Sequence, residues 1–282
     1  MGCHLCLSDN FQEIARYTEP DRYEQAVGVT DENYYRAWAK CMNCGFIYSR
    51  YSRDPNVLDL LYESGYREGS SNFRRQGTTR EIFDKVISLP PDQSETHARV
   101  SWIKREIKIL EDAGHRSAPM GKQLMLDIGG ATGVFAYSFL DENWDAEVVD
   151  PAESGRFIEE FNIRYHQRPY GAGTASRSID LAALVFVLEH LRQPREILLQ
   201  AKKDLAASGL IYIEVPDAAA FRLKQPDDDI FNSCHLHMFD PASLTRLLNE
   251  CEIDVMALAR TKTRRGNLAL SVLGSARSGS QT

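Results

Sequence analysis

The period of the apolar positions changes along the chain, and the predicted structure changes with it. A helical pattern begins at Ser94, a suitable cap, and ends before Gly114. Its apolar residues are three or four positions apart, at Val100, Ile103, Ile107 and Leu110. We expect this helix to pack on the first strand of the fold that follows it.

Further along, short apolar runs predict strands that alternate with helices. A strand at 124–128 leads through a glycine-rich turn into an apolar helix at 134–140. A strand, a glycine turn and a helix in this order form the ligand-binding corner of a parallel α/β sheet. Near the end of the chain, an amphipathic helix at 242–250 precedes two apolar stretches, at 255–259 and 268–273.

The first fifty residues are polar and carry two pairs of cysteines, Cys3 with Cys6 and Cys41 with Cys44. Two C-x-x-C pairs supply the four thiolates of a tetrahedral zinc site, and the run after the second pair predicts a strand of a zinc ribbon. Two alternatives are open. The four thiols are packed as small apolar residues, or His4 replaces one of the cysteines as a ligand.

The composition of the 282 residues is that of a globular protein, with 43% apolar and 26% charged residues. No apolar run approaches the ~20 residues of a membrane helix, and the N-terminus lacks a secretion signal, so we expect a soluble cytoplasmic protein. The net charge is −7, and residues 1–50 contain five basic and seven acidic residues. This balance disfavours a nucleic-acid partner, and it leaves the oligomeric state open.

The glycine-rich turn has its glycines at Gly129, Gly130 and Gly133, a spacing that differs from the G-x-G-x-x-G of dinucleotide-binding loops and argues against NAD. Asp127, just before the turn, suits a ligand with a positive centre. Asp150 ends the next predicted strand, and its carboxylate can accept hydrogen bonds from both hydroxyls of a ribose.

From this point the chain resembles the class I S-adenosylmethionine-dependent methyltransferases. The matching motifs are the runs 127–133, 149–151, 179–191 and 209–216. The resemblance covers residues 119–275. It implies an α/β fold with a Rossmann-like, seven-stranded methyltransferase sheet, closed by an antiparallel pair of strands.

The resemblance also implies that S-adenosylmethionine is the cofactor, and it assigns roles to particular residues. The three glycines would line the methionine moiety, and Asp150 would hold the ribose. Leu188 and Glu189 would lie beneath the cofactor near its methyl group, and either Gln167 or backbone and apolar groups would meet the adenine. A degenerate fold that binds nothing is the alternative.

A second motif carries two histidines, His235 and His237, which alternate with apolar residues. An extended segment would turn both imidazoles to one side, toward the strand ends where ligands bind, so both are candidate catalytic residues. His235 is the candidate general base, since an imidazole titrates near neutral pH. A structural role is favoured for His237, and Cys234 and Cys251 are expected as buried thiols.

The cysteine-rich N-terminus, the tyrosine-bearing run 61–66 and the His-x-His-x-Phe segment are similar to a group that includes the deoxysugar C-methyltransferases. In that group a histidine matching His235 is the proposed base, acting beside a ketone on a nucleotide-linked sugar. The glutamate that commonly precedes that histidine is Cys234 here, and the group's long C-terminal domain has no counterpart in these 282 residues. The resemblance implies a small, carbohydrate-related acceptor that is methylated at carbon or oxygen.

The sequence thus predicts four parts: a zinc-binding module at 1–50, a helical linker or lid at 51–118, the methyltransferase domain at 119–275 and a flexible tail at 276–282. In the linker, Arg74, Arg75 and Arg80 either hold an anionic group of the substrate or belong to a solvated loop. The basic cluster between the last two strands is expected as a solvated hairpin tip. Two other functions are open: a zinc-ribbon RNA methyltransferase and a non-catalytic, cofactor-binding partner protein.

Overall fold

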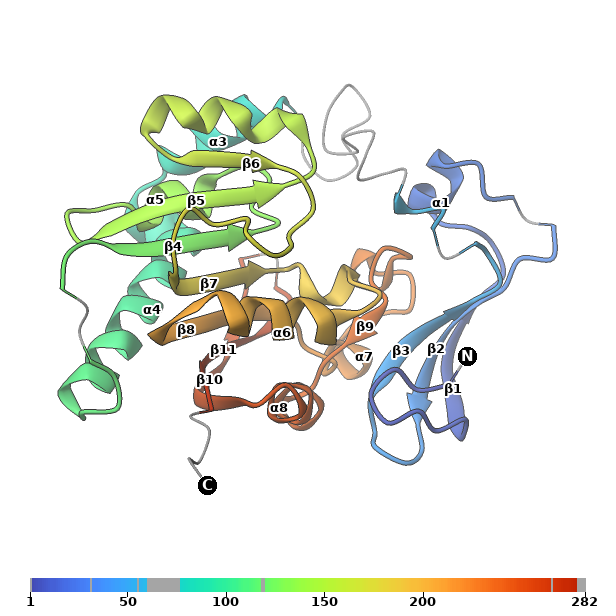
Figure 1. Ribbon diagram of the computed structural model, residues 1–282. Helices are drawn as coiled ribbons and strands as arrows, with labels where there is room; N and C mark the ends of the chain where they lie inside the picture. Colours follow the sequence, from blue (N-terminus) through green and yellow to red (C-terminus); the bar gives the residue numbers. More distant parts are fainter. Residues whose placement is uncertain are drawn as a thin grey trace.

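The computed structural model contains two β-sheets, one of seven strands and one of four, which lie side by side (Figure 1). It describes residues 2–30, 32–54, 56–59, 77–117, 120–264 and 266–277. The tyrosine-bearing run 61–66 and the candidate arginines Arg74 and Arg75 lie outside the described residues. No helix within the ranges given is both long enough and apolar enough to cross a membrane.

The large sheet has the strand order β10-β11-β8-β7-β4-β5-β6. Its central strands pair in parallel, whereas β11 pairs antiparallel with both β8 and β10. The predicted seven-stranded mixed sheet and its closing hairpin are therefore confirmed. The strands are β4 (Gln123–Ile128), β5 (Trp144–Asp150), β6 (Arg164–Gln167), β7 (Ile179–Val185), β8 (Leu205–Pro216), β10 (Ile253–Lys262) and β11 (Leu268–Ala276).

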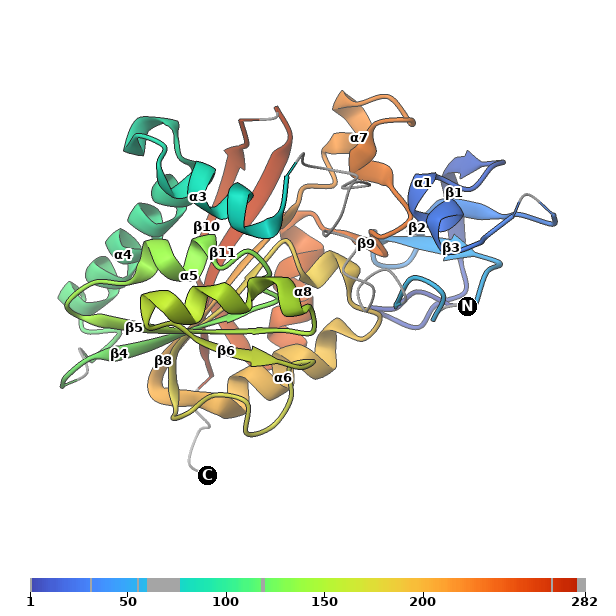
Figure 2. The ribbon, with the colours of Figure 1, turned by 90° about the horizontal axis from the view of Figure 1, so that it is seen from above.

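Helices cover both faces of the large sheet (Figure 2). Because successive side chains of a strand point to opposite faces, Met125 of β4 packs with one set of helices and Leu126 with the other. The first set is α3 (Thr79–Ile87), α4 (Glu95–Asp112), α5 (Val134–Phe139) and the 3-10 helix η2 (Glu153–Phe161). The second set is α6 (Pro194–Asp204) and α8 (Pro241–Glu250).

Helix α4 is the helix that the apolar spacing predicts before the first strand. The Ser94 hydroxyl accepts a hydrogen bond from the backbone N–H of His97 at 3.1 Å, and Gly114 takes a positive φ of 73° just after the helix ends. The four apolar residues predicted for its inner face are buried in one core with Met125. The prediction of this helix and of its docking is confirmed.

The small sheet is antiparallel and has the strand order β1-β2-β3-β9. Three strands come from the N-terminal segment, which also forms the short helix α1 (Arg22–Ala26): β1 (Phe11–Tyr17), β2 (Arg36–Cys41) and β3 (Ile47–Tyr51). The fourth strand, β9 (His237–Met238), comes from the other end of the chain and pairs with Ile47 and Tyr48. The cysteine-bearing sheet therefore contains a strand that the first fifty residues alone did not predict.

Short elements connect the rest: η1 (Pro91–Gln93), η3 (Leu188–His190), α7 (Ala220–Leu223) and η4 (Asp229–Phe231). The tip of the β10–β11 hairpin was expected to be solvated, and Arg260 and Arg264 are both exposed, although each also contacts another part of the protein. Arg264 donates hydrogen bonds to the Glu95 carboxylate and to the carbonyl of Asp92. Arg260 forms an ion pair with the buried Asp217. The tip thus folds back against the start of α4.

Candidate active site and metal centre

The four paired cysteines meet at one point at the end of the small sheet. The Sγ atoms of Cys3 and Cys44 are 3.6 Å apart, and those of Cys6 and Cys41 are 3.5 Å apart. Zn–S bonds of about 2.3 Å in a tetrahedron place their sulfurs roughly 3.8 Å apart, whereas a disulfide needs about 2.05 Å. The cluster is therefore close to the geometry of a zinc site, and all four ligand atoms lie within 4.8 Å of one another.

Tight turns aim these sulfurs at a common centre. The backbone N–H of Gly45 donates to the carbonyl of Cys41 at 2.9 Å, and Gly45 adopts a φ of 76° that favours glycine. Burial acts to raise the pKa of the Cys6 thiol, but hydrogen bonds from the Ser8 backbone and the Asn43 amide outweigh it and lower that pKa to about 6. Burial raises the pKa of the Cys3 and Cys44 thiols in the same cluster, so binding of zinc would have to displace protons from these two cysteines.

The glycine-rich turn follows β4 at the carboxyl end of the large sheet. Gly129 and Gly133 have φ values of 74° and 68°, and Gly133 begins α5. A Cβ atom on Gly130 would lie 2.5 Å from a carboxylate oxygen of Asp127, so only glycine fits beside that side chain. The turn thus presents exposed backbone and the start of a helix to a ligand.

Asp150 lies at the end of β5, beside this turn. Its carboxylate accepts hydrogen bonds from the backbone N–H groups of Ala131, at 3.0 Å, and Ala152, at 2.9 Å. Gln167, the last residue of β6, is its partner in the strand register. A carboxylate offers about four lone-pair positions, so two remain for a ribose diol.

A cavity of about 560 Å³ opens from the turn toward α3, α4 and the β10–β11 hairpin. This volume lies in the range of small-molecule sites. Five of the candidate residues from the sequence line this cavity: Asp127, Gly129, Gly130, Glu189 and His235. Four other candidates do not line it: Gly133, Asp150, Leu188 and His237.

His235 reaches this cavity from the segment between η4 and β9, and only 5% of its surface is exposed. Its Nδ1 lies 2.7 Å from the carbonyl of Ile230. A carbonyl oxygen can only accept, so Nδ1 carries the proton and Nε2 carries the lone pair. In this tautomer the ring is able to take up a proton.

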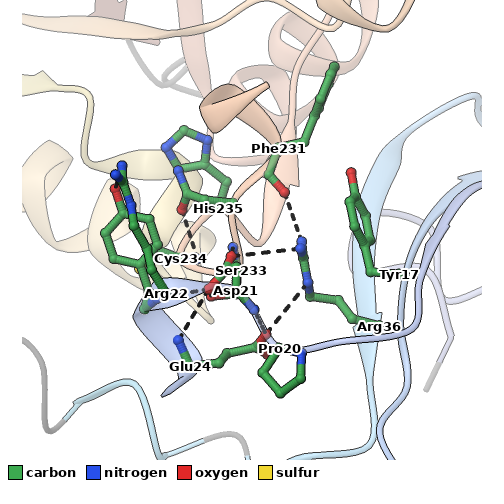
Figure 3. A network of polar contacts seen from close by, with 12 residues as sticks. Tyr17, Pro20, Asp21, Arg22, Glu24, Arg36, Phe231, Ser233, Cys234 and His235 are labelled. Atoms are coloured by element: carbon green, nitrogen blue, oxygen red, sulfur yellow. Dashed lines mark hydrogen bonds and ion pairs between the residues drawn. The ribbon is translucent and has the colours of Figure 1, made fainter. Parts of the chain in front are cut away.

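The small sheet holds the backbone that carries His235 (Figure 3). Asp21 accepts hydrogen bonds from the backbone N–H and the hydroxyl of Ser233, at 2.6 and 2.8 Å. Arg36, only 2% exposed, donates to the carbonyl of Phe231 at 2.7 Å, and Arg53 donates to the carbonyl of Ser233 at 3.1 Å. The N-terminal segment therefore fixes this part of the cavity wall.

His237 does not accompany His235 to the cavity. It is completely buried between the two sheets, where its ring meets those of His4 and Phe46, with centroids 5.1 and 5.5 Å away. Its Nε2 lies 2.8 Å from the carbonyl of Leu191. Burial and the neighbouring His4 lower the pKa of His237 to about 3, so the ring stays neutral. The two imidazoles thus have different surroundings, contrary to the expectation of a shared side.

The remaining candidates have structural partners. Leu188 is buried in the core beneath α6 and α8. Arg80 forms ion pairs with Asp84 and Glu160 on the protein itself. Cys234 and Cys251 are both buried, as expected.

Three cavity residues were missed by sequence reasoning. Arg99 of α4 binds the Glu214 carboxylate through two nitrogens, at 2.5 and 2.6 Å. Phe186 has a strained φ of 54° at the end of β7, and Arg264 comes from the hairpin tip. Arg99 lies on a helix far from the motifs, and no sequence signal identified it. Arg264 belongs to the basic cluster between the last two strands, which was expected to be a solvated hairpin tip rather than part of the cavity. The position of Phe186 directly after an apolar strand was a signal that could have been used.

The sequence was compared with protein families and with known proteins. A family described as "Methyltransferase domain" matches residues 102–257, which is more than half of the chain. The matched span begins inside α4 and ends inside β10. No curated protein matches the sequence.

Solved structures are similar to this chain at low sequence identity. One is the 1,6-didemethyltoxoflavin-N1-methyltransferase of Burkholderia thailandensis, with bound 1,6-didemethyltoxoflavin and S-adenosylhomocysteine; it has a TM-score of 0.55 and 13% identity, and the match covers 84% of this chain and 98% of that one. Another is the N-methyltransferase NodS of Bradyrhizobium japonicum WM9 in complex with S-adenosylhomocysteine, with a TM-score of 0.48, 14% identity and coverage of 72% and 100%.

Proposed function

The chain belongs to the methyltransferase domain family and is an S-adenosylmethionine-dependent methyltransferase, and from this premise we propose that it methylates a small, carbohydrate-related acceptor at carbon or oxygen. The observation that carries the proposal is that the glycine-rich turn and His235 line one cavity. The donor side and the proton-accepting side of a methyl transfer are thereby brought to the same space.

The proposed cofactor residues surround the turn after β4. Gly129 and Gly130 line the cavity where the methionine moiety would lie, and Gly133 stands beside them at the start of α5. Asp150 has two lone-pair positions for the ribose hydroxyls. When bound there, S-adenosylmethionine supplies a methyl group on a positively charged sulfur. The buried carboxylates of Asp127 and Glu189 line the cavity and favour that positive charge.

The acceptor is proposed to occupy the part of the cavity between His235 and the hairpin. Its polar lining suits a hydroxylated molecule, because Arg99, Asn267 and Thr263 offer hydrogen-bonding groups. We assign to His235 the role of the base that takes the proton from an acceptor hydroxyl or from a carbon beside a ketone, because an imidazole titrates near neutral pH. The carbohydrate class itself rests on the similarity of the sequence to deoxysugar C-methyltransferases.

We propose zinc for the four-cysteine site, in a structural role. The cluster lies at the end of the small sheet and away from the cavity lining, and all four positions of a tetrahedron are taken by sulfur, which leaves none for a substrate. Zinc bound there would stabilise the N-terminal strands in the conformation that hydrogen-bonds to the segment carrying His235.

A panel of sugars and nucleotide-linked sugars, incubated with the purified protein and S-adenosylmethionine, tests the proposed function. We expect S-adenosylhomocysteine to form with a member of this panel, and His235→Ala to lose at least about 100-fold in kcat, the contribution expected of a general base. A matched His166→Asn variant, altered on β6 outside the cavity, should keep wild-type turnover. Turnover of His235→Ala at the wild-type rate would refute the proposed base.

A further inference from the structure

Glu189, His190 and His235 form a second cluster of metal-ligating side chains, separate from the four cysteines. Their ligand atoms all lie within 4.8 Å of one another. Glu189 is fully buried, the His190 side chain is 10% exposed and His235 is 5% exposed. The cluster joins η3, which follows β7, to the segment that the small sheet holds in place.

Both imidazoles are held in the same tautomer. The Nδ1 of His190 lies 2.9 Å from the carbonyl of Cys234, and the Nδ1 of His235 lies 2.7 Å from the carbonyl of Ile230. Because carbonyl oxygens only accept, both Nδ1 atoms carry hydrogen and both Nε2 atoms carry lone pairs. A backbone carbonyl that binds one ring nitrogen is the usual support for a histidine that binds metal through the other.

The three side chains come together in a place that is shielded from water. The Nε2 of His190 lies 3.8 Å from the Oε1 of Glu189. Imidazole nitrogens and carboxylate oxygens are both ligands that bind divalent transition-metal ions, and ligand atoms at such distances can share one ion.

We propose that Glu189, His190 and His235 bind a divalent cation at the acceptor end of the cavity. Two imidazoles and one carboxylate suit manganese, iron or zinc, and three ligands leave coordination positions open. Glu189 and His235 both line the cavity, so these positions face the space proposed for the acceptor. The cation would bind an oxygen of the acceptor there.

This inference rests on the proposed function for the place of the acceptor, and it changes how the proton leaves. With a cation bound, His235 is a ligand and no longer the base. The cation lowers the pKa of the coordinated hydroxyl, which releases its proton to water. The alkoxide oxygen then forms a bond to the methyl carbon while the sulfur–carbon bond breaks, so the products are the methyl ether and neutral S-adenosylhomocysteine.

Manganese is the probe for this site, because soft thiolates select zinc whereas imidazole and carboxylate accept manganese. Mn²⁺ is titrated into the zinc-loaded full-length protein, and binding is followed by calorimetry and by the electron paramagnetic resonance signal of free Mn²⁺. The variants are Glu189→Gln and His190→Asn. His166→Asn is the matched control, since His166 also pairs with a buried glutamate, Glu147, at 2.8 Å but has no second imidazole in that pair.

We expect one Mn²⁺ per chain in the wild type and in His166→Asn, and affinity at least about 100-fold weaker in the other two variants, since even loss of a supporting hydrogen bond costs 10–100-fold. His190→Asn and His166→Asn should still bind S-adenosylhomocysteine, and Glu189→Gln should keep the wild-type circular dichroism spectrum and zinc content, which shows that each variant is folded. Absence of Mn²⁺ binding by wild-type protein, or equal binding by all variants, would overturn the cation site. If methyl transfer by such a metal-free protein still depends on His235, the proposed function stands without the cation. If the wild type fails to bind S-adenosylhomocysteine, the proposed function itself fails.

Discussion

The two sheets of this protein are built in different ways. The large sheet has apolar cores on both faces, and its strands and helices follow one another along the chain. The small sheet shares its apolar core with other parts of the chain, and it also contains four converging cysteines, a strand from the other end of the chain and buried ion pairs. The comparison teaches that the side of the cavity proposed for the cofactor is made by local motifs, whereas the opposite wall is made by distant contacts.

Charged side chains are what join the two regions. Glu24 is fully buried and pairs with Arg53 at 2.7 Å, and Arg36 lies 3.7 Å from the same carboxylate. Both arginines also donate to carbonyls of the His235 segment. A buried charge that loses its partner costs several kcal/mol, so this network fixes one arrangement of the small sheet against the segment.

Removal of a cysteine ligand should have the largest effect, and it tests whether the two sheets can be disturbed separately. We expect Cys41→Ser to bind much less than one zinc per chain and to lose at least about 100-fold in methyl transfer, because binding of structural zinc is worth about 10 kcal/mol or more and is coupled to folding. The affinity of the large sheet for S-adenosylhomocysteine should change by less than about 3-fold, an amount worth under 1 kcal/mol.

Elemental analysis, turnover and calorimetry measure these three properties on one sample. Cys251→Ser is the control, since Cys251 is also buried but caps the end of α8 and is not one of the four clustered cysteines. It should retain zinc and turnover. Full activity of Cys41→Ser without zinc would show that the small sheet does not shape the cavity.

A substitution in the glycine-rich turn tests the large sheet in the same way. In Gly130→Ala the new methyl group would lie 2.5 Å from a carboxylate oxygen of Asp127 and 2.9 Å from Val148. Such overpacking costs about 1–3 kcal/mol, so affinity for S-adenosylhomocysteine should fall by about 10-fold or more while the zinc content stays the same. Gly171→Ala is the control, because a Cβ there meets nothing within 4 Å. Equal affinity in both variants would contradict the assignment of this turn.

A subtler variant tests whether the small sheet positions His235. Asp21→Ala removes two hydrogen bonds to Ser233, and hydrogen bonds to a charged group are worth about 1.5–3 kcal/mol. We expect kcat to fall by about 10-fold with unchanged affinity for S-adenosylhomocysteine. The exposed Glu19→Gln is the control in the same segment. A fall in cofactor affinity with normal kcat would mean that Asp21 supports cofactor binding and does not position His235.

The smallest expected effect concerns the contact between the sheets. The pKa of His237 is about 3 in the folded protein, below the value of about 6.5 in an unfolded chain, so the unfolded state binds the extra proton as the pH falls. Stability is therefore full above pH 6.5 and decreases below it, by about 1.4 kcal/mol at pH 5.5. Denaturant unfolding at pH 7.5 and 5.5 measures the difference, and His237→Leu should reduce it by that amount. An identical pH dependence in the variant would mean that the pKa of His237 does not differ between the folded and unfolded states.

The features that could be predicted from the sequence are those built from local motifs, and the features that could not are those built from distant contacts. The strand at 124–128, the last two strands, α4, α8 and the glycine-rich turn were predictable, because each depends on spacing within a short stretch. The four-cysteine cluster was predictable for the same reason, since two C-x-x-C pairs restrict where the sulfurs can point. The seven-stranded sheet as a whole followed from the resemblance to class I methyltransferases.

The rest depends on contacts between distant residues. The strand β9 is only two residues long, and its pairing with Ile47 and Tyr48 has no local signature. Alternation correctly placed His235 but gave His237 the same side, because the segment is not a regular strand before residue 237. His190 was overlooked beside Glu189, although it completes the cluster with His235 only after the chain has folded.

The central claim is that the large sheet binds the cofactor independently of the wall that carries His235. Calorimetric titration of wild type, Asp150→Ala and His235→Ala with S-adenosylhomocysteine tests it most directly. We predict that wild type and His235→Ala bind with affinities within about 3-fold of each other, and that Asp150→Ala binds at least about 10-fold more weakly, since a hydrogen bond to a carboxylate is worth about 1.5–3 kcal/mol. Absence of binding to the wild type, or equal binding by Asp150→Ala, would contradict the account.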